Sequence, residues 1–192
     1  VVAFVGAALL GTLMAAFRIS PIAPLRGVGL VFVEVFRNVP LMSLMIVVVY
    51  ALPEIGITMS FTTSVIVSMV CVGGAFLCEA VRGGINAVPP GQIEAARSLG
   101  FTFTGLLAHV VLPQALRSMV QPLVTVFIGV LISSSLAGVV GVRDLTATVS
   151  WINNQEARGL ETFLVAAVMY LVLALLAGAV GDRLERKLRV LR

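Results

Sequence analysis

Long apolar stretches separated by short polar segments dominate this chain. Five of them, at about residues 1–17, 40–53, 62–81, 119–140 and 160–180, carry at most one charged side chain each. The apolar core of a lipid bilayer is about 30 Å thick, and a helix needs roughly 20 apolar residues to cross it. The pattern therefore predicts an all-α integral membrane protein with about five transmembrane helices.

Proline and glycine mark the expected edges of the second stretch. It extends back through residues 27–36 if Pro40 kinks or breaks the helix there. Pro53, Glu54 and Gly56 mark a turn after it, and residues 62–64 are suited to cap the third stretch. The first stretch has no leading basic region and no small-residue cleavage pattern, so we interpret it as a membrane span and not as a signal peptide.

Composition agrees with lipid as the main solvent. Of the 192 residues, 59% are hydrophobic and only 11% are charged, and the mean hydropathy is +1.11. We expect a single membrane domain over residues 1–192, without a separate soluble domain. The net charge of +4 comes from basic residues at the ends of apolar stretches. Anionic lipid head groups account for basic residues there, so we expect membrane lipid and not nucleic acid as their partner.

The distribution of arginine and lysine predicts the orientation. If the chain begins outside, only Arg143 and Arg158 are external, and eleven basic residues are cytoplasmic. The eleven are Arg18, Arg26, Arg37, Arg82, Arg97, Arg117, Arg183, Arg186, Lys187, Arg189 and Arg192. By the positive-inside rule, the N-terminus lies outside and the C-terminus inside.

Residues 82–117, here called the loop segment, form the longest polar interruption and face the cytoplasm in this topology. Pro89 and Pro90 suit the start of a short helix, and Gly100 suits a left-handed cap at its end. A surface for a soluble partner is expected here.

The charged residues of this short helix suit its dipole. Glu94 lies in the first half, where a carboxylate favours the positive end, and Arg97 lies near the negative end. Ala95 and Ala96 have almost no side chain, so we expect another protein to approach the backbone closely at these two positions.

A family resemblance becomes specific at these residues. Glu94-Ala95-Ala96, then Gly100, then Leu112-Pro113 resembles the EAA loop of permeases from importers of the ATP-binding-cassette (ABC) class. Further segments resemble the same family in order and spacing: Phe36-Arg37-Asn38-Val39-Pro40-Leu41, residues 79–85, 88–92 and 112–117, and residues 140–145. Together they cover roughly residues 30–150 and resemble permeases for polar amino acids.

The resemblance implies a type I ABC importer permease fold with a five-helix core in the bacterial cytoplasmic membrane. It implies a second permease subunit, two cytoplasmic ATPase subunits and an external substrate-binding protein as partners. The helix around residues 94–99 would dock into a groove on one ATPase subunit, and closure of the ATPases on ATP would rock the bundle. ATP and Mg would be bound by the ATPases. This chain has no Gly-rich phosphate loop, and we expect it to be neither an enzyme nor a holder of a cofactor or metal.

One departure from the family bears on the substrate. Where the family commonly reads Lys-Asp-Thr-Ser-Leu, this chain reads Ile132-Ser133-Ser134-Ser135-Leu136, so an intramembrane ion pair is missing. We hypothesise a heterodimer whose other half keeps the pair. The lack of a carboxylate in this span leans away from cationic substrates and towards glutamate or glutamine.

Several residues are candidates for a gate or a translocation contact. Glu79 and Arg82 stand three apart, on one helical face, and either tie the span to the loop or contact the substrate. Arg37 is a further candidate. Ser133, Ser134 and Ser135 either bind substrate or hydrogen-bond the backbone one turn back, which is commoner in membrane helices.

Other polar residues favour structural roles. His109, the only histidine, is expected to pack near the interface, with a proton relay as the alternative. Cys71 and Cys78 share one helix face and are interpreted as small packing residues. Asp144 and Trp151 belong to a polar external segment, either an interfacial helix or a contact for the binding protein.

Two alternatives and one terminal segment complete the analysis. A membrane-embedded enzyme would need a cluster of His, Asp, Glu or Cys, which this sequence does not offer. A passive channel or a scaffold not coupled to ATP also fits the composition. Residues 182–192 form a basic amphipathic tail, which we interpret as a lipid anchor first and an ATPase contact second.

Overall fold

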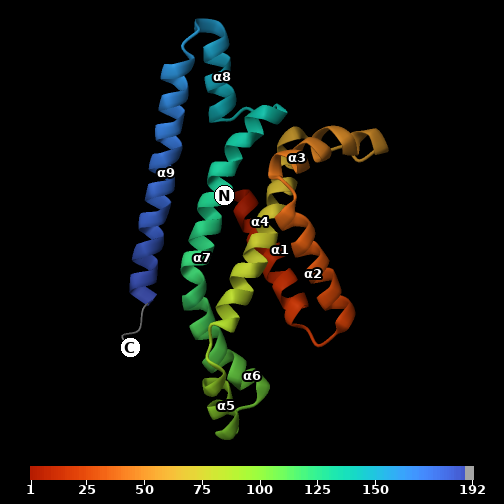
Figure 1. Cartoon of the computed structure of the whole chain (residues 1–192), viewed down its shortest axis with the longest axis vertical. Helices are drawn as coiled ribbons and strands as arrows, with labels where there is room; N and C mark the ends of the chain where they lie inside the picture. The colour runs from red at the N-terminus through yellow and green to blue at the C-terminus, as the bar shows by residue number, and fades with distance from the viewer. Residues whose placement is uncertain (189–192) are drawn as a thin grey trace.

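The computed structural model describes residues 1–188, and this part of the chain contains helices and no strand (Figure 1). Its long helices are α1 (Val2–Ile19), α2 (Ala23–Asn38), α4 (Phe61–Asn86), α7 (Leu112–Ser133) and α9 (Gly159–Leu188). Shorter helices are α3 (Leu41–Ile46), α5 (Pro90–Ser98), α6 (Phe103–Leu106) and α8 (Leu145–Glu156). The predicted all-α class is confirmed.

Four helical runs are long and apolar enough to cross a membrane: α1, α4, residues 103–140 and α9. A fifth is present if α2 is counted together with residues 41–55, which follow it after a bend of 102°. About five spans are therefore confirmed. The break falls at Val39 and Pro40, because proline disfavours helical geometry in the residue before it.

Two helical runs widen into π-helical turns just before a proline. Val47–Ala51 (η1) precedes Pro53, and Leu107–Val111 (η3) precedes Pro113. A proline ring has no N–H to donate and clashes with the carbonyl four residues back. A locally wider turn relieves that clash without ending the helix, so the chain continues from α6 through η3 into α7.

Two apolar runs end in a tighter 3-10 helix, and the cap of α4 differs from the predicted one. A 3-10 helix, Leu52–Ile55 (η2), ends at Gly56, whose φ is +85°, and another, Ser134–Val140 (η4), follows α7. The cap of α4 is Ser60, whose Oγ accepts from the N–H of Thr63 at 3.1 Å. The cap is therefore not among residues 62–64, and Ser64 is instead buried.

Helices α1 and α4 form the most extensive helix pair, and small residues hold them close. Ala7 and Gly11 of α1 face Gly73 and Gly74 of α4. A Cβ atom built on Gly11 would lie 2.7 Å from the carbonyl oxygen of Gly74. In lipid, where apolar side chains gain little by avoiding water, such close backbone packing is a main source of helix association.

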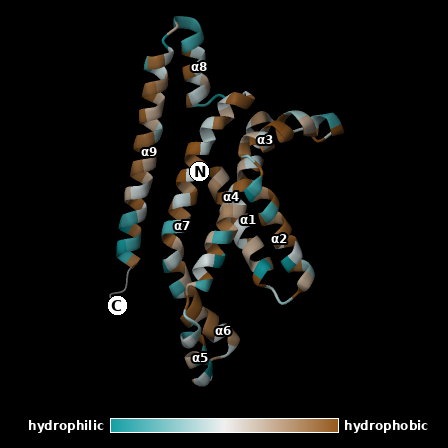
Figure 2. Ribbon diagram, in the orientation of Figure 1, coloured by the Kyte–Doolittle hydropathy of each residue, from teal (hydrophilic) through white to brown (hydrophobic). Residues whose placement is uncertain are grey.

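The polar segments gather at the two ends of the bundle. Helices α5 and α6, the turn between α1 and α2, and the C-terminal end of α9 lie at one end, and α8 lies at the other (Figure 1). Helix α9 is hydrophobic along most of its length and hydrophilic at its C-terminal end (Figure 2). The segments predicted to be cytoplasmic thus mostly share one end. The predicted basic tail is helical as far as Leu188, and residues 189–192 lie outside the described residues.

We predict that Gly11→Ala lowers the free energy of unfolding by roughly 1–3 kcal/mol, because the added methyl group separates α1 from α4. Unfolding of the purified protein by SDS, followed by circular dichroism, measures this. Gly27→Ala is the matched control, since a Cβ there meets nothing within 4 Å, and we expect it to be neutral or slightly stabilising. Equal effects of the two substitutions would contradict the packing account.

Candidate functional site

Helix α5 lies within the loop segment. It begins and ends where proline and glycine predict. Pro89 is its N-cap, Pro90 its first residue, and Gly100 follows its end with a φ of +82°. The N–H of Phe101 donates to the carbonyl of Ala96 at 3.2 Å, and that of Gly100 donates to Arg97 at 3.0 Å. These bonds close the helix end as a left-handed glycine cap does.

The two alanines of α5 differ in burial. Ala95 is exposed, but Ala96 is only 6% exposed and packs in a cluster with Val88, Leu106 and Val111. The expectation that both positions admit another protein is therefore wrong for Ala96. Its small size instead lets α5 lie close to the chain that follows it, which the spacing of the motif alone did not indicate.

Helix α5 is tied to the start of α7 by a pair of glutamines. Gln114 Nε2 donates to Gln92 Oε1 at 2.6 Å and to the carbonyl of Val110 at 3.0 Å. Leu112 and Pro113, predicted with the loop, form the beginning of α7. The loop segment is thus a small folded unit fixed to the bundle.

The exposed side of the loop segment is partly charged and partly apolar. Glu94 and Arg97 are exposed, and neither side chain forms an ion pair within residues 1–188. Leu99 is 80% exposed and Phe103 is 75% exposed. Large apolar side chains at the tip of a polar segment are typical of a protein-docking surface. Sequence reasoning missed Phe103, although an aromatic residue three positions after the Gly100 cap was a usable signal.

Glu79 is shared by arginines from three helices. Its Oε1 atom accepts hydrogen bonds from Nη1 of Arg18 on α1 and from Nη1 of Arg82 on α4, the latter at 3.3 Å. Nη1 of Arg37 on α2 lies 3.9 Å from the same oxygen. These four residues, here called the Glu79 cluster, join α1, α2 and α4. The spacing predicted the contact with Arg82, but not the contacts with Arg18 and Arg37, which depend on tertiary packing.

Arg37 lies near the end of α2 opposite to Arg26. The two arginines, both predicted to be cytoplasmic, are eleven helical positions apart, about 16 Å along α2. Its guanidinium carbon lies 5.8 Å from the centre of the Phe76 ring. Contact with Glu79 and with an aromatic face stabilises the charge of Arg37 between the helices.

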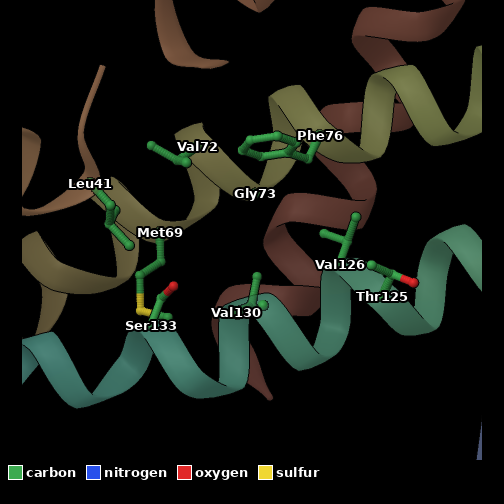
Figure 3. A pocket seen from close by; sticks show the side chains of 10 residues that line it. Leu41, Met69, Val72, Gly73, Phe76, Thr125, Val126, Val130 and Ser133 are labelled. Carbon is green, nitrogen blue, oxygen red and sulfur yellow. The ribbon is translucent and has the colours of Figure 1, made fainter. Parts of the chain in front are cut away.

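A cavity of about 260 Å³ lies between α3, α4 and α7. Figure 3 shows side chains of α4 facing those of α7 across it. Its lining residues are Leu41, Met69, Val72, Gly73, Phe76, Thr125, Val126, Gly129, Val130 and Ser133. None of them is charged, and only Thr125 and Ser133 carry a hydroxyl group.

The serines at the end of α7 differ in their hydrogen bonds. Ser134 Oγ donates to the carbonyl of Leu131 at 2.6 Å, as expected for a serine bonding one turn back. Ser133 lines the cavity, and its hydroxyl has no hydrogen-bond partner within residues 1–188. Of the three serines, Ser133 is thus the one that the structure brings to a cavity.

The remaining candidates have local roles. His109 Nδ1 pairs with the carbonyl of Gly105 at 3.0 Å on the exposed side of the loop segment. Asp144 caps α8, where its Oδ1 accepts from the N–H of Ala147 at 2.7 Å. Cys71 and Cys78 are free cysteines on α4. Within residues 1–188, no group of three or more His, Cys, Asp or Glu side chains is placed to hold a metal.

The fold and the loop segment define a class of protein: a multi-pass helical protein of the cell membrane with a folded segment exposed at one end. A family model described as "Binding-protein-dependent transport system inner membrane component" matches residues 7–190. The chain belongs to this family, whose members are the membrane components of transport systems that use a separate binding protein.

Individual relatives are similar over nearly the whole chain. It is 38% identical over 178 residues to the probable glutamine ABC transporter permease protein GlnP of Bacillus subtilis (strain 168), covering 91% of this chain and 82% of that protein. GlnM of the same organism, also named a probable glutamine ABC transporter permease, is 34% identical, with 98% and 87% covered. A solved structure described as an amino acid ABC transporter with histidines has a TM-score of 0.93 and 31% identity, covering 97% of this chain and 87% of that one.

We predict that Glu79→Gln destabilises the bundle, because three guanidinium groups then lie together without a carboxylate. The expected loss is roughly 1–3 kcal/mol in the free energy of unfolding, below the range for a fully buried pair because these side chains are partly exposed. SDS unfolding measures it. Glu34→Gln is the control, since Glu34 is exposed on α2 and forms no ion pair within the described chain. A Glu79→Gln protein as stable as the control contradicts a structural role for the cluster.

Proposed function

We propose that this chain is one of two permease subunits of an ABC importer for polar amino acids, with glutamine or glutamate as the favoured substrates. The observation that carries the proposal is the family match over residues 7–190, which extends through the loop segment. The two glutamine-permease relatives support the choice of substrate. The cavity favours the same choice, because it has no carboxylate to pair with a cationic side chain.

ATP hydrolysis is assigned to partner subunits that hold ATP and Mg on the cytoplasmic side. In this proposal the ATPases dock on Glu94, Ala95 and Arg97 of α5 and on the exposed apolar residues Leu99 and Phe103. An external binding protein delivers the amino acid to the end of the bundle that carries α8. The second permease subunit completes the pathway, and a heterodimer accounts for the missing ion pair beside Ser133.

The connections of α5 would transmit its movement to α4 and α7. Three residues separate it from the end of α4, and the bond between Gln92 and Gln114 ties it to α7. Helices α4 and α7 form two walls of the cavity. A displacement of α5 therefore acts directly on the helices that line the candidate pathway, as alternating access requires.

The proposed function is tested by transport in proteoliposomes that contain the complete importer. We expect labelled glutamine to accumulate against its gradient with ATP present, and accumulation to stop when ATP hydrolysis is blocked. Flux down the gradient that is indifferent to ATP would identify a passive channel and overturn the importer assignment.

We predict that Glu94→Lys and Ala95→Leu each reduce glutamine uptake at least about tenfold, because a tenfold effect needs only about 1.4 kcal/mol of lost docking energy. Both residues are exposed, so membrane insertion and SDS unfolding remain unchanged. Co-purification of the ATPase subunits and uptake rates give the readout.

Two comparisons sharpen this experiment. Glu54→Lys makes the same charge change on η2, away from the loop segment, and we expect normal uptake. Ala96→Leu is expected to destabilise the protein, because Ala96 packs against Val88 and Leu106. Normal uptake by both Glu94→Lys and Ala95→Leu would remove the docking role from α5.

A further inference from the structure

The Glu79 cluster carries more positive charge than its single carboxylate balances. Three guanidinium groups, from Arg18, Arg37 and Arg82, surround one carboxylate oxygen, which leaves two formal positive charges. Unbalanced charge among apolar helices is costly, and ionisable groups kept there commonly mark the path of a charged substrate. The cluster therefore has the electrostatics of an anion site.

The three arginines differ in hydrogen bonding and in exposure. Arg18 is only 15% exposed, and both Arg18 and Arg82 donate hydrogen bonds to Glu79. Arg37 is 44% exposed, stands 3.9 Å from Glu79 and donates no hydrogen bond to any residue within 1–188. A guanidinium group has five N–H donors in a planar fork that matches a carboxylate. Arg37 is thus the most exposed arginine of the cluster and the one that donates no hydrogen bond to Glu79.

Arg37 does not line the cavity, but its side chain faces a residue that does. The ring of Phe76, which its guanidinium faces at 5.8 Å, lines that cavity. Leu41, just beyond the break at Pro40, lines it as well. Arg37 is therefore one side chain away from the cavity, behind the ring of Phe76.

The residues that line the cavity include no cation that could pair with the α-carboxylate of an amino acid. Among its lining residues, Thr125 already donates its hydroxyl to the carbonyl of Gln121 at 3.0 Å. Ser133 keeps a free hydroxyl, and the other walls are apolar or glycine. A carboxylate inside would be left without a cation unless Arg37, beside the Phe76 ring, supplied one.

We propose that Arg37 binds the α-carboxylate of the amino acid as it passes this cavity, with Arg18 and Arg82 holding Glu79 so that it does not compete for Arg37. This inference rests on the proposed function and names the group of the substrate that this subunit recognises. The remaining positive charge of the cluster also disfavours amino acids with cationic side chains.

The test measures binding of labelled L-glutamine to the purified complex of permease and ATPase subunits without the binding protein, in vesicles of neutral lipid. L-glutaminamide, in which an amide replaces the α-carboxylate, is the competitor. For the wild-type complex we expect glutaminamide to bind at least about tenfold more weakly than glutamine. For Arg37→Gln we expect the affinity for glutamine to fall by about the same factor and the affinity for glutaminamide to stay unchanged.

Three further complexes separate this role from a structural one. Arg37→Lys should restore part of the preference for glutamine, since it keeps the charge but not the planar fork. Arg26→Gln removes a positive charge from an exposed site on the same helix and should behave as wild type. In vesicles with anionic lipid, the effect of Arg37→Gln should be the same as in neutral lipid.

Each contrary result is distinct. An Arg37→Gln complex that binds glutamine as wild type does, or that loses glutamine and glutaminamide equally, overturns the carboxylate site. A defect confined to anionic lipid assigns Arg37 to lipid head groups and overturns it too. A wild-type complex that accumulates no amino acid with ATP overturns the proposed function. If the wild-type complex transports uphill and the Arg37→Gln variant binds glutamine as the wild type does, only this inference is overturned.

Discussion

The apolar interior of a bilayer offers no water to polar groups, and this constraint accounts for most features of the structure. Helices satisfy this constraint because their backbone hydrogen bonds are internal. The π-helical turns before Pro53 and Pro113 keep two helical runs continuous. Most charges lie near the ends of the bundle or are gathered around Glu79, and Glu34 is exposed on α2. The loop segment folds into a compact unit at one end of the bundle (Figures 1 and 2).

That arrangement separates two tasks along the same helices. At one end, the loop segment exposes charged and apolar side chains while Ala96 packs inward. Further along, α4 and α7 line the cavity, and Arg37 of α2 contacts Phe76 in its wall. The helices that hold the loop segment also shape the cavity, so in the proposed function no additional element is needed to connect docking with movement.

The sequence predicts features that depend on local chemistry. The limits of α5 follow from Pro90 and Gly100, and the break before α3 follows from Pro40, because these residues restrict the backbone wherever they occur. The contact of Glu79 with Arg82 follows from helical spacing. The orientation, N-terminus outside and C-terminus inside, remains a prediction from the charge pattern.

Features that depend on packing between helices were not predictable from one sequence. The 102° bend, the burial of Ala96 and the approach of Arg18 and Arg37 to Glu79 each need the position of a second element. Glu79 still offered a signal, since it is the one acidic residue within the first three apolar stretches. A carboxylate in such a place requires cations, but spacing alone does not say which helices provide them.

The central claim, that a cytoplasmic motor acts on α5, depends on the side of the membrane that this helix faces. In a background with Cys71 and Cys78 replaced by alanine, Ala95→Cys and Asn154→Cys place single thiols on exposed sites of α5 and α8. A membrane-impermeant maleimide should label Ala95→Cys in inside-out vesicles and Asn154→Cys in right-side-out vesicles. Labelling of Ala95→Cys only in right-side-out vesicles, or in neither kind, would contradict the account.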